Sequence, residues 1–280
     1  MKTHILFFSF FLFLQSVGQT DFQKLQQEYI SRKPFLDTMH AYPAVPFDSI
    51  KVLSKEGIPI SFWWMPQDKS RGKPGNKTKG TILLVHGFMM NKSHMLSRAK
   101  IYYDFGYNVI LMDLRARGQS GGSTTTSGPE ISWDVIAVMD YYENKLKDNG
   151  PLVLAGYSHG GRAVVFAAEK KPQNVKAVIL ESIPYSLTES FKRTYKMNPP
   201  PIPEGNISEA FRTIANIPIL LMTGENDMAI IPEEAALIKE SNKNSASRFI
   251  MIKGAGHDLS GEKYRQVYGE AIKSFLVALK

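Results

Sequence analysis

The chain of 280 residues contains no cysteine. This excludes thiolate nucleophiles, zinc ribbons, iron–sulfur centres, disulfides and lipid-anchoring cysteines. A covalent nucleophile must then be Ser, Thr, Lys or a carboxylate. The sequence also lacks a P-loop, and Gly254-Ala255-Gly256 lacks the third glycine and the following helix of a dinucleotide site. We therefore expect no cofactor and no bound metal.

Clustered charge is scarce as well. Thirty-four Lys and Arg against 26 Asp and Glu give a net charge of +8, which can indicate nucleic acid or an anionic membrane as a partner. The densest basic stretch, Lys69 to Lys79, contains Pro74 and two glycines but no aromatic residue that could stack on bases. We interpret it as a solvated loop, expect no nucleic-acid partner, and assign the basic excess to the surface and to solubility.

The apolar run near the N-terminus is short. Ile5 to Leu14 follows the positive Lys2 and precedes Ser16-Val17-Gly18, which has small residues at the positions that a signal peptidase requires. Ten residues rise about 15 Å as a helix, half of what a bilayer core needs. Residues 1–18 are therefore predicted to be a signal peptide, and the mature chain to be secreted or periplasmic without stable membrane insertion.

Two patterns of apolar residues follow the signal peptide. An amphipathic stretch from Phe22 to Leu36 predicts a helical extension over residues 19–45, ahead of one domain over residues 46–280. At the start of that domain, Ser49 to Leu53 and Ile58 to Trp64 alternate and are joined by a short turn, which predicts a β-hairpin.

The rest of the domain repeats short apolar runs that do not alternate. Such runs suit strands that are buried on both faces, and the stretches between them have helical periodicity. The pattern predicts an α/β fold, a mostly parallel sheet with helices on both faces. The runs are Ile82 to Val85, Val109 to Met112, Leu152 to Ala155, Ala177 to Leu180, Ile219 to Met222 and Phe249 to Ile252.

Reactive side chains follow these strands. Ligand sites in open α/β sheets form beyond the carboxyl ends of the strands, so we expect these side chains to gather at one edge. In chain order they are His86, Asp113, Ser158, Glu181, Asp227 and His257.

The third of these side chains lies in the motif Gly156-Tyr157-Ser158-His159-Gly160, between a buried strand and a helix. A strand-to-helix turn this sharp strains the central residue, and side chains two positions away would clash. The turn exposes the Ser158 hydroxyl beside the positive end of the helix dipole. The context predicts that Ser158 is a nucleophile.

A serine hydroxyl needs a general base, and histidine has the suitable pKa. His257 follows the last strand, in a loop of small residues that can fold back over the sheet edge. The carboxylate that orients it is expected to be Asp227, with Glu181 as the rival because it ends the preceding strand. Asp258 is expected to stabilise the loop instead.

These residues resemble the α/β-hydrolase superfamily, and the resemblance covers residues 46–280. The superfamily's triad order, Ser, acid, His, matches Ser158, Asp227 and His257. The resemblance implies an oxyanion hole made by the backbone amides of Phe88 and His159. Residues 113–120 look like the D-x-R-x-H-G-x-S turn of small esterase-like and serine-aminopeptidase-like members, with Arg117 where histidine is common.

A long interval separates the strand that ends at Glu181 from the one that leads to Asp227. In the family this insertion is a short cap between the sixth and seventh strands, here at about residues 183–215. Its apolar residues either form a wall over the nucleophile or only pack the cap onto the core. The candidates for substrate binding are Met89, Tyr185, Phe191 and Tyr195.

The predicted function is that of an exported serine hydrolase, a carboxylesterase that cleaves small-molecule acyl esters through an acyl-enzyme. An aminopeptidase-like amide hydrolase with the same triad is the alternative, and Glu189 and Glu209 are its candidates for binding a free amino terminus. The alternative of another class is a non-catalytic ligand-binding protein on a hydrolase scaffold.

Overall fold

The computed structural model describes residues 45, 47–67, 78–146, 150–196, 198 and 203–279. The predicted signal peptide, nearly all of the predicted extension over residues 19–45 and most of the basic stretch Lys69 to Lys79 lie outside these residues.

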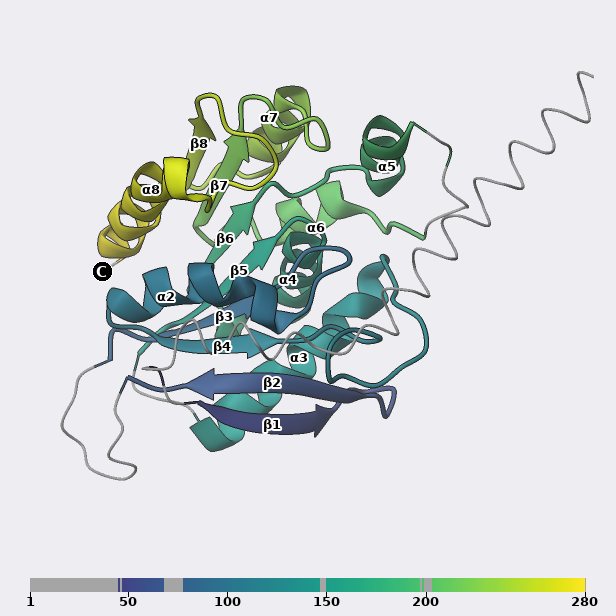
Figure 1. Cartoon of the computed structure of the whole chain (residues 1–280), viewed down its shortest axis with the longest axis vertical. Coiled ribbons are helices and arrows are strands. Elements are labelled where there is room, and N and C mark those ends of the chain that lie inside the picture. Colours follow the sequence, from purple (N-terminus) through teal and green to yellow (C-terminus); the bar gives the residue numbers. More distant parts are fainter. Residues whose placement is uncertain are drawn as a thin grey trace, which may run out of the picture.

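One eight-stranded sheet forms the centre of the molecule, in the order β1-β2-β4-β3-β5-β6-β7-β8 (Figure 1). The strands β3 to β8 are parallel, whereas β1 pairs antiparallel with β2, and β2 pairs antiparallel with β4. The predicted hairpin and mostly parallel sheet are thereby confirmed. The strands are β1 Asp48–Leu53, β2 Pro59–Met65, β3 Thr81–Val85, β4 Asn108–Met112, β5 Leu152–Tyr157, β6 Ala177–Glu181, β7 Ile219–Gly224 and β8 Arg248–Ile252.

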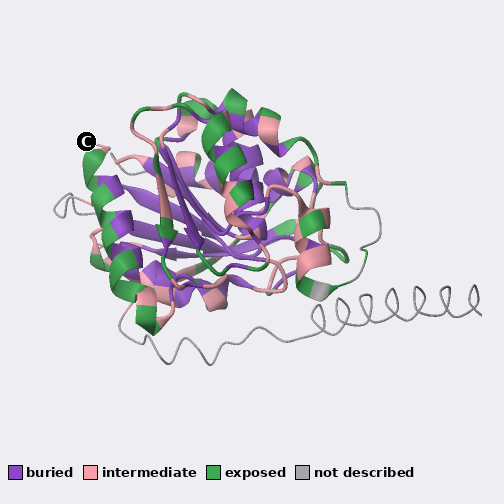
Figure 2. Cartoon of the chain, turned by 90° about the horizontal axis from the view of Figure 1, so that it is seen from above, coloured by how far each residue is buried: buried purple, intermediate pink, exposed green. Residues whose placement is uncertain are grey.

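Helices cover both faces of this sheet. The helices α3, α4, α6 and α7 contribute to the apolar cluster on one face, and α2 and α8 to the cluster on the other. Figure 2 shows buried strands between helices that are exposed only on their outer sides. The α-helices are α2 Leu96–Asp104, α3 Ser132–Tyr141, α4 His159–Lys170, α5 Leu187–Tyr195, α6 Ile207–Thr213, α7 Pro232–Ser241 and α8 Arg265–Ala278.

The strand β3 illustrates why the apolar runs do not alternate. Successive side chains of a strand point to opposite faces. Leu83 and Val85 belong to the cluster under α3 and α4, whereas Ile82 and Leu84 belong to the cluster under α2 and α8. Because both faces are covered by helices, every residue of β3 is buried.

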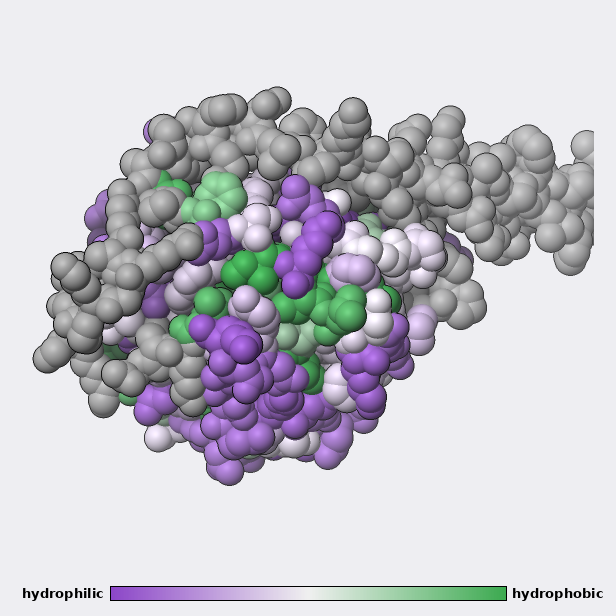
Figure 3. Space-filling model, turned by 90° about the horizontal axis from the view of Figure 1, so that it is seen from below, coloured by the Kyte–Doolittle hydropathy of each residue, from purple (hydrophilic) through white to green (hydrophobic). Residues whose placement is uncertain are grey.

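The hairpin edge of the sheet has a different pattern. Residues of β1 alternate between half-buried and exposed, with Ile50 and Val52 packed against the core and Leu53 exposed. Seen from below, this side of the molecule carries apolar side chains framed by hydrophilic ones (Figure 3). The sheet edge is therefore only partly covered by the described residues.

The predicted cap segment, residues 183–215, divides into two parts with different packing. Ile207, Ala210 and Phe211 of α6 are buried in the core beside α4. The helix α5 lies farther out and is mostly exposed or half-buried. In this segment, α6 is therefore part of the layer that covers the sheet, and α5 is the element that projects from it.

The described residues form the helices given above. None of the helices among them combines the length and the apolar character that a bilayer crossing demands.

Candidate functional site

Ser158 stands between β5 and α4, at the turn that the motif predicts. Its backbone angles are φ 51° and ψ −119°, a conformation that residues with side chains rarely adopt. Its amide donates a hydrogen bond of 2.8 Å to the carbonyl of Glu181 on β6. Strain of this kind persists only where the surroundings hold it, and it concentrates at active sites.

The glycines on either side of Ser158 allow close backbone approaches. A Cβ on Gly156 would lie 2.5 Å from the carbonyl oxygen of Gly160. A Cβ on Gly160 would lie 2.4 Å from the carbonyl oxygen of His86 and 2.5 Å from that of Val85. Since these neighbours are backbone atoms, they cannot move aside, and only glycine fits at both positions.

His257 and Asp227 are brought together from the loops after β8 and β7. The Nδ1 atom of His257 lies 2.9 Å from Oδ2 and 3.1 Å from Oδ1 of Asp227. Asp227 is buried, and its Oδ1 also accepts hydrogen bonds from the amides of Ala229 and Ile230. With Nδ1–H donated to the carboxylate, Nε2 of His257 is left as the basic nitrogen. The His257 side chain is 34% exposed, which gives it access to a substrate.

The loop after β3 contains the other expected residues. Met90 donates its amide to the carbonyl of Gly87, which closes a turn around Phe88 and Met89, and Met89 has a φ of 58°. His86 holds the base of this turn, because its Nδ1 contacts the carbonyl of Gly87 and its Nε2 accepts the amide of Leu114. Burial lowers the pKa of His86 to about 4, so the ring is neutral and structural.

Phe88 and His159, whose amides are the expected oxyanion donors, are neighbours in the structure. Their rings lie 5.8 Å apart and almost perpendicular. His159 is the first residue of α4, so its amide is among the four that lack an acceptor within the helix. Its ring is buried, and burial lowers its pKa to about 3, with the charge of Arg162 as a smaller cause. The ring is therefore neutral near neutral pH.

Two further strand-end acids are committed to buried cations. Asp113 forms an ion pair with the buried Lys92. Glu181 accepts Nε of Arg98 at 2.8 Å and Nη2 at 2.6 Å. The carboxylate beside the His257 ring is that of Asp227, whereas Glu181 binds the backbone of the same loop through the amide of Leu259.

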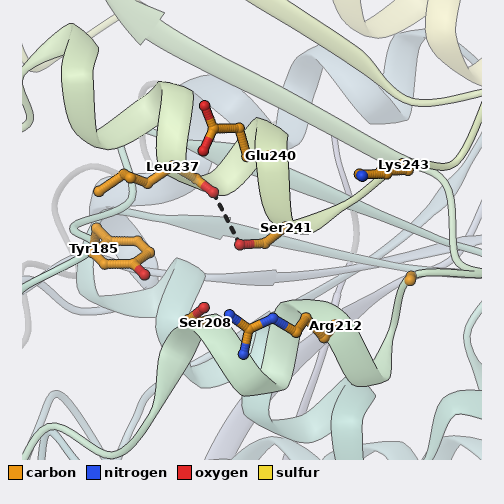
Figure 4. Close-up of a pocket in the computed structure, with 8 residues that line it drawn as sticks. Tyr185, Ser208, Arg212, Leu237, Glu240, Ser241 and Lys243 are labelled. Atoms are coloured by element: carbon orange, nitrogen blue, oxygen red, sulfur yellow. Dashed lines mark hydrogen bonds between the residues drawn. The ribbon is translucent and has the colours of Figure 1, made fainter.

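The four expected substrate-binding residues lie in different surroundings. Phe191 on α5 is buried, and Met89 is half-buried in the loop after β3. Tyr185 lines a groove of about 540 Å³ between α6 and α7, together with Ser208 and Leu237 (Figure 4). Tyr195 ends α5, and its side chain lies outside the described residues.

Two buried arginines near the site were missed by the sequence analysis. Arg98 on α2 binds Glu181 and Asp258. Arg162 on α4 donates to the carbonyls of Pro184 and Tyr185 at 3.1 and 2.9 Å, and also to that of Glu204. An arginine within a helical pattern is usually on the surface, so the sequence carries no signal for these contacts.

Among the described residues, no three His, Asp or Glu side chains are grouped so that they could hold a metal ion.

A family model described as the alpha/beta hydrolase fold matches residues 80–213, a range that includes Phe88 and Ser158. The sheet order and the turn at Ser158 agree with that match. The chain has the α/β-hydrolase fold.

Relatives of this α/β hydrolase are distant in sequence but similar over most of their length. Protein bem46 of Schizosaccharomyces pombe is 22% identical over 80% of this chain and 76% of its own. YqkD of Bacillus subtilis, whose function is uncharacterised, is 23% identical over 82% of both chains.

Solved structures share the fold of this α/β hydrolase. The esterase Pf2001 of Pyrococcus furiosus superposes with a TM-score of 0.73 at 19% identity, over 85% of this chain and 92% of its own. Est1E of Butyrivibrio proteoclasticus, solved with ferulic acid, gives a TM-score of 0.68 at 19% identity, over 81% and 98% of the two chains.

Proposed function

We propose that this α/β hydrolase is a serine carboxylesterase, which cleaves small-molecule acyl esters through an acyl-enzyme. The observation that carries the proposal is the placement of Ser158, in a strained turn at the start of α4, beside the sheet edge where His257 binds Asp227. The esterases among the structures with the same fold support the ester as substrate.

In the acylation step, Nε2 of His257 takes the proton of the Ser158 hydroxyl as its oxygen attacks the ester carbonyl carbon. The buried carboxylate of Asp227 stabilises the imidazolium that forms. The carbonyl oxygen becomes an oxyanion, which accepts hydrogen bonds from the amides of Phe88 and His159. One such donor contributes about 3 kcal/mol to transition-state stabilisation. The imidazolium then protonates the leaving oxygen of the ester as its C–O bond breaks, and the alcohol departs.

Deacylation repeats these steps with water. His257 removes a proton from the water as its oxygen attacks the acyl carbon. The second tetrahedral intermediate collapses, the bond to the Ser158 oxygen breaks, and that oxygen recovers its proton from His257. The products are the carboxylic acid and the free enzyme.

The amide alternative has weaker support. Glu189 pairs with Lys192 three residues away, and Glu209 pairs with Arg212 in the same way. Both carboxylates are more than half exposed, so neither is held in a recess that could fix a substrate ammonium group. The geometry of these two side chains therefore favours the ester.

The proposal is tested with a fluorophosphonate probe and activated esters. The folded protein is expected to be labelled at Ser158, and Ser158→Ala is expected to lose both labelling and ester turnover. A folded protein that resists the probe would return the non-catalytic ligand-binding alternative. Faster turnover of aminoacyl amides than of acyl esters would favour the peptidase-like one.

Separate replacements distinguish the two acids. Asp227→Asn is expected to lower kcat by about 10⁴-fold, because the orienting carboxylate fixes the tautomer of the general base. Glu181→Gln is expected to lower kcat less and to destabilise the fold, because it leaves the buried Arg98 without its buried carboxylate partner and with only the exposed Asp258. Equal losses of kcat in steady-state assays would contradict this assignment.

Export is part of the proposal and rests on residues 1–18 alone. Expression in a bacterial host is expected to yield a mature chain that starts near Gln19 in the periplasm or medium. Intact-mass analysis of that fraction tests the cleavage, and a full-length chain in the cytoplasm would contradict it.

A further inference from the structure

A buried ion cluster lies beneath the loop that carries His257. Its centre is the guanidinium of Arg98 on α2, which binds Glu181 at the end of β6 through two hydrogen bonds. Glu181 also accepts the hydroxyl of Tyr268 on α8 at 2.9 Å. The proposed mechanism uses none of these three side chains. Both Arg98 and Glu181 are almost completely buried, so the cluster is not a solvated surface pair.

Three consecutive residues of the loop are bound to this cluster or beside it. The carbonyl of His257 accepts the hydroxyl of Ser182 at 3.0 Å. Oδ1 of Asp258 accepts Nη2 of Arg98 at 2.8 Å. The amide of Leu259 donates to Oε1 of Glu181 at 3.3 Å. The backbone on both sides of Asp258, directly after His257, is thus fixed to the end of β6 and to Ser182.

The same cluster reaches the nucleophile. The carbonyl of Glu181 accepts the amide of Ser158 at 2.8 Å. The ring of Tyr157 contacts both Arg98 and His257: it lies 4.4 Å from the Arg98 guanidinium and 5.2 Å from the His257 ring. Glu181 therefore binds the turn that carries Ser158 through its backbone carbonyl, and the loop that carries His257 through its side chain.

We propose that Arg98, Glu181 and Asp258 act as a clamp that positions His257 relative to Ser158. This inference rests on the proposed function, because it assigns the clamp to the proton transfer between those two side chains. A buried ion pair contributes little net stability compared with well-packed apolar groups, so its value here is geometric. A misplacement of about 1 Å between reacting groups can lower a rate about 100-fold.

Asp258 is the member of the clamp that can be changed without disturbing the core. Its side chain is 62% exposed, and its loss leaves the buried Arg98–Glu181 pair intact. Asp258→Ala is expected to lower kcat about 10- to 100-fold with KM within 2-fold of wild type. Fluorophosphonate labelling of Ser158 is expected to slow by the same factor, and the melting temperature to change little.

Asp258→Asn is the conservative variant. It keeps Oδ1, the atom that accepts hydrogen bonds from Arg98 and Ser260, and it removes the charge. It is expected to restore kcat to within about 3-fold of wild type. Asp104→Ala is the matched control, because Asp104 is an exposed aspartate on α2, the helix that carries Arg98, and it pairs with Lys100. It is expected to leave kcat and KM unchanged.

Rates are referred to active sites titrated with the probe, so a partly unfolded preparation does not imitate a slow enzyme. An unchanged kcat per active site in Asp258→Ala would overturn the clamp and leave the esterase proposal standing. A loss in Asp258→Asn as large as in Asp258→Ala would also overturn it, because charge and not positioning would then act. A wild-type protein with neither labelling nor turnover would overturn both proposals.

Discussion

At the scale of single residues, the site depends on positions where no side chain fits. Gly156 and Gly160 lie on either side of Ser158, whose backbone is strained. A Cβ added to either glycine would lie within 2.5 Å of a carbonyl oxygen of a neighbouring residue. The contact of Gly160 is with the backbone of Val85 and His86, the residues that lead into the expected oxyanion loop. The glycine therefore sets the distance between α4 and that loop as well as the shape of the serine turn.

Gly160→Ala tests this close approach. The added Cβ cannot be accommodated without shifting α4 or β3, so the free energy of unfolding is expected to fall by about 1–3 kcal/mol. Denaturant unfolding measures the loss. Gly261→Ala is the matched control, because no described atom lies within 4 Å of a Cβ at that position and its φ is negative. Similar losses in both variants would show that close approach is not the cause.

At the scale of elements, the sequence was most informative where burial is symmetric. The strand β3 was predicted to within one residue, because both of its faces are covered and its apolar run is continuous. The segment over residues 183–215 was harder to interpret. Apolar residues in α5 and α6 look alike in sequence, and it is the burial of Ile207, Ala210 and Phe211 in the core that shows which helix covers the sheet.

The candidate site could also be predicted where it depends on the sheet. Ser158, Asp227 and His257 could be picked out because the ends of parallel strands share one edge, and the structure places His257 beside Asp227 as that rule requires. Arg98 could not be found in this way, since its partner Glu181 is 83 residues away and pairing across elements leaves no local pattern.

Arg162 provides a prediction at the same scale, because it ties α4 to both ends of the segment that contains α5. It is fully buried and donates to the carbonyls of Pro184, Tyr185 and Glu204. Arg162→Met is expected to cost about 3 kcal/mol of unfolding free energy, because buried carbonyls lose their donor.

Arg212→Met is the control for this variant. Arg212 is 61% exposed and pairs only with the exposed Glu209 among the described residues. Its loss is expected to change the unfolding free energy by less than about 0.5 kcal/mol. Chemical denaturation of the two variants side by side measures the difference, and a small effect of Arg162→Met would contradict the tie.

At the scale of the whole molecule, charges of both signs are buried in equal numbers among the described residues. The sequence was interpreted as placing the basic excess on the surface, for solubility. Five carboxylates are buried among the described residues, which leaves no net positive charge there, because the buried cationic side chains also number five. Several of these cationic side chains hold loops at the sheet edge, as Arg98 and Lys92 do through Glu181 and Asp113. The five cationic side chains are Lys92, Arg98, Arg115, Arg117 and Arg162.

Buried histidines give the whole molecule a predictable sensitivity to acid. Burial lowers the pKa of His86 from an ordinary 6.5 to about 4. Between pH 6.5 and 4, His86 therefore binds a proton in the unfolded chain and stays neutral in the folded protein. Stability therefore rises with pH across this window and is lost as the pH falls from 6.5 towards 4.

His86→Gln is expected to reduce the slope of unfolding free energy against pH by about 1 kcal/mol per unit between pH 4.5 and 6. Urea unfolding at several pH values measures both slopes. Because burial also lowers the pKa of His159, to about 3, the double variant with His159→Gln is expected to be flatter still. Parallel slopes for wild type and His86→Gln would mean that His86 takes up its proton in the folded protein.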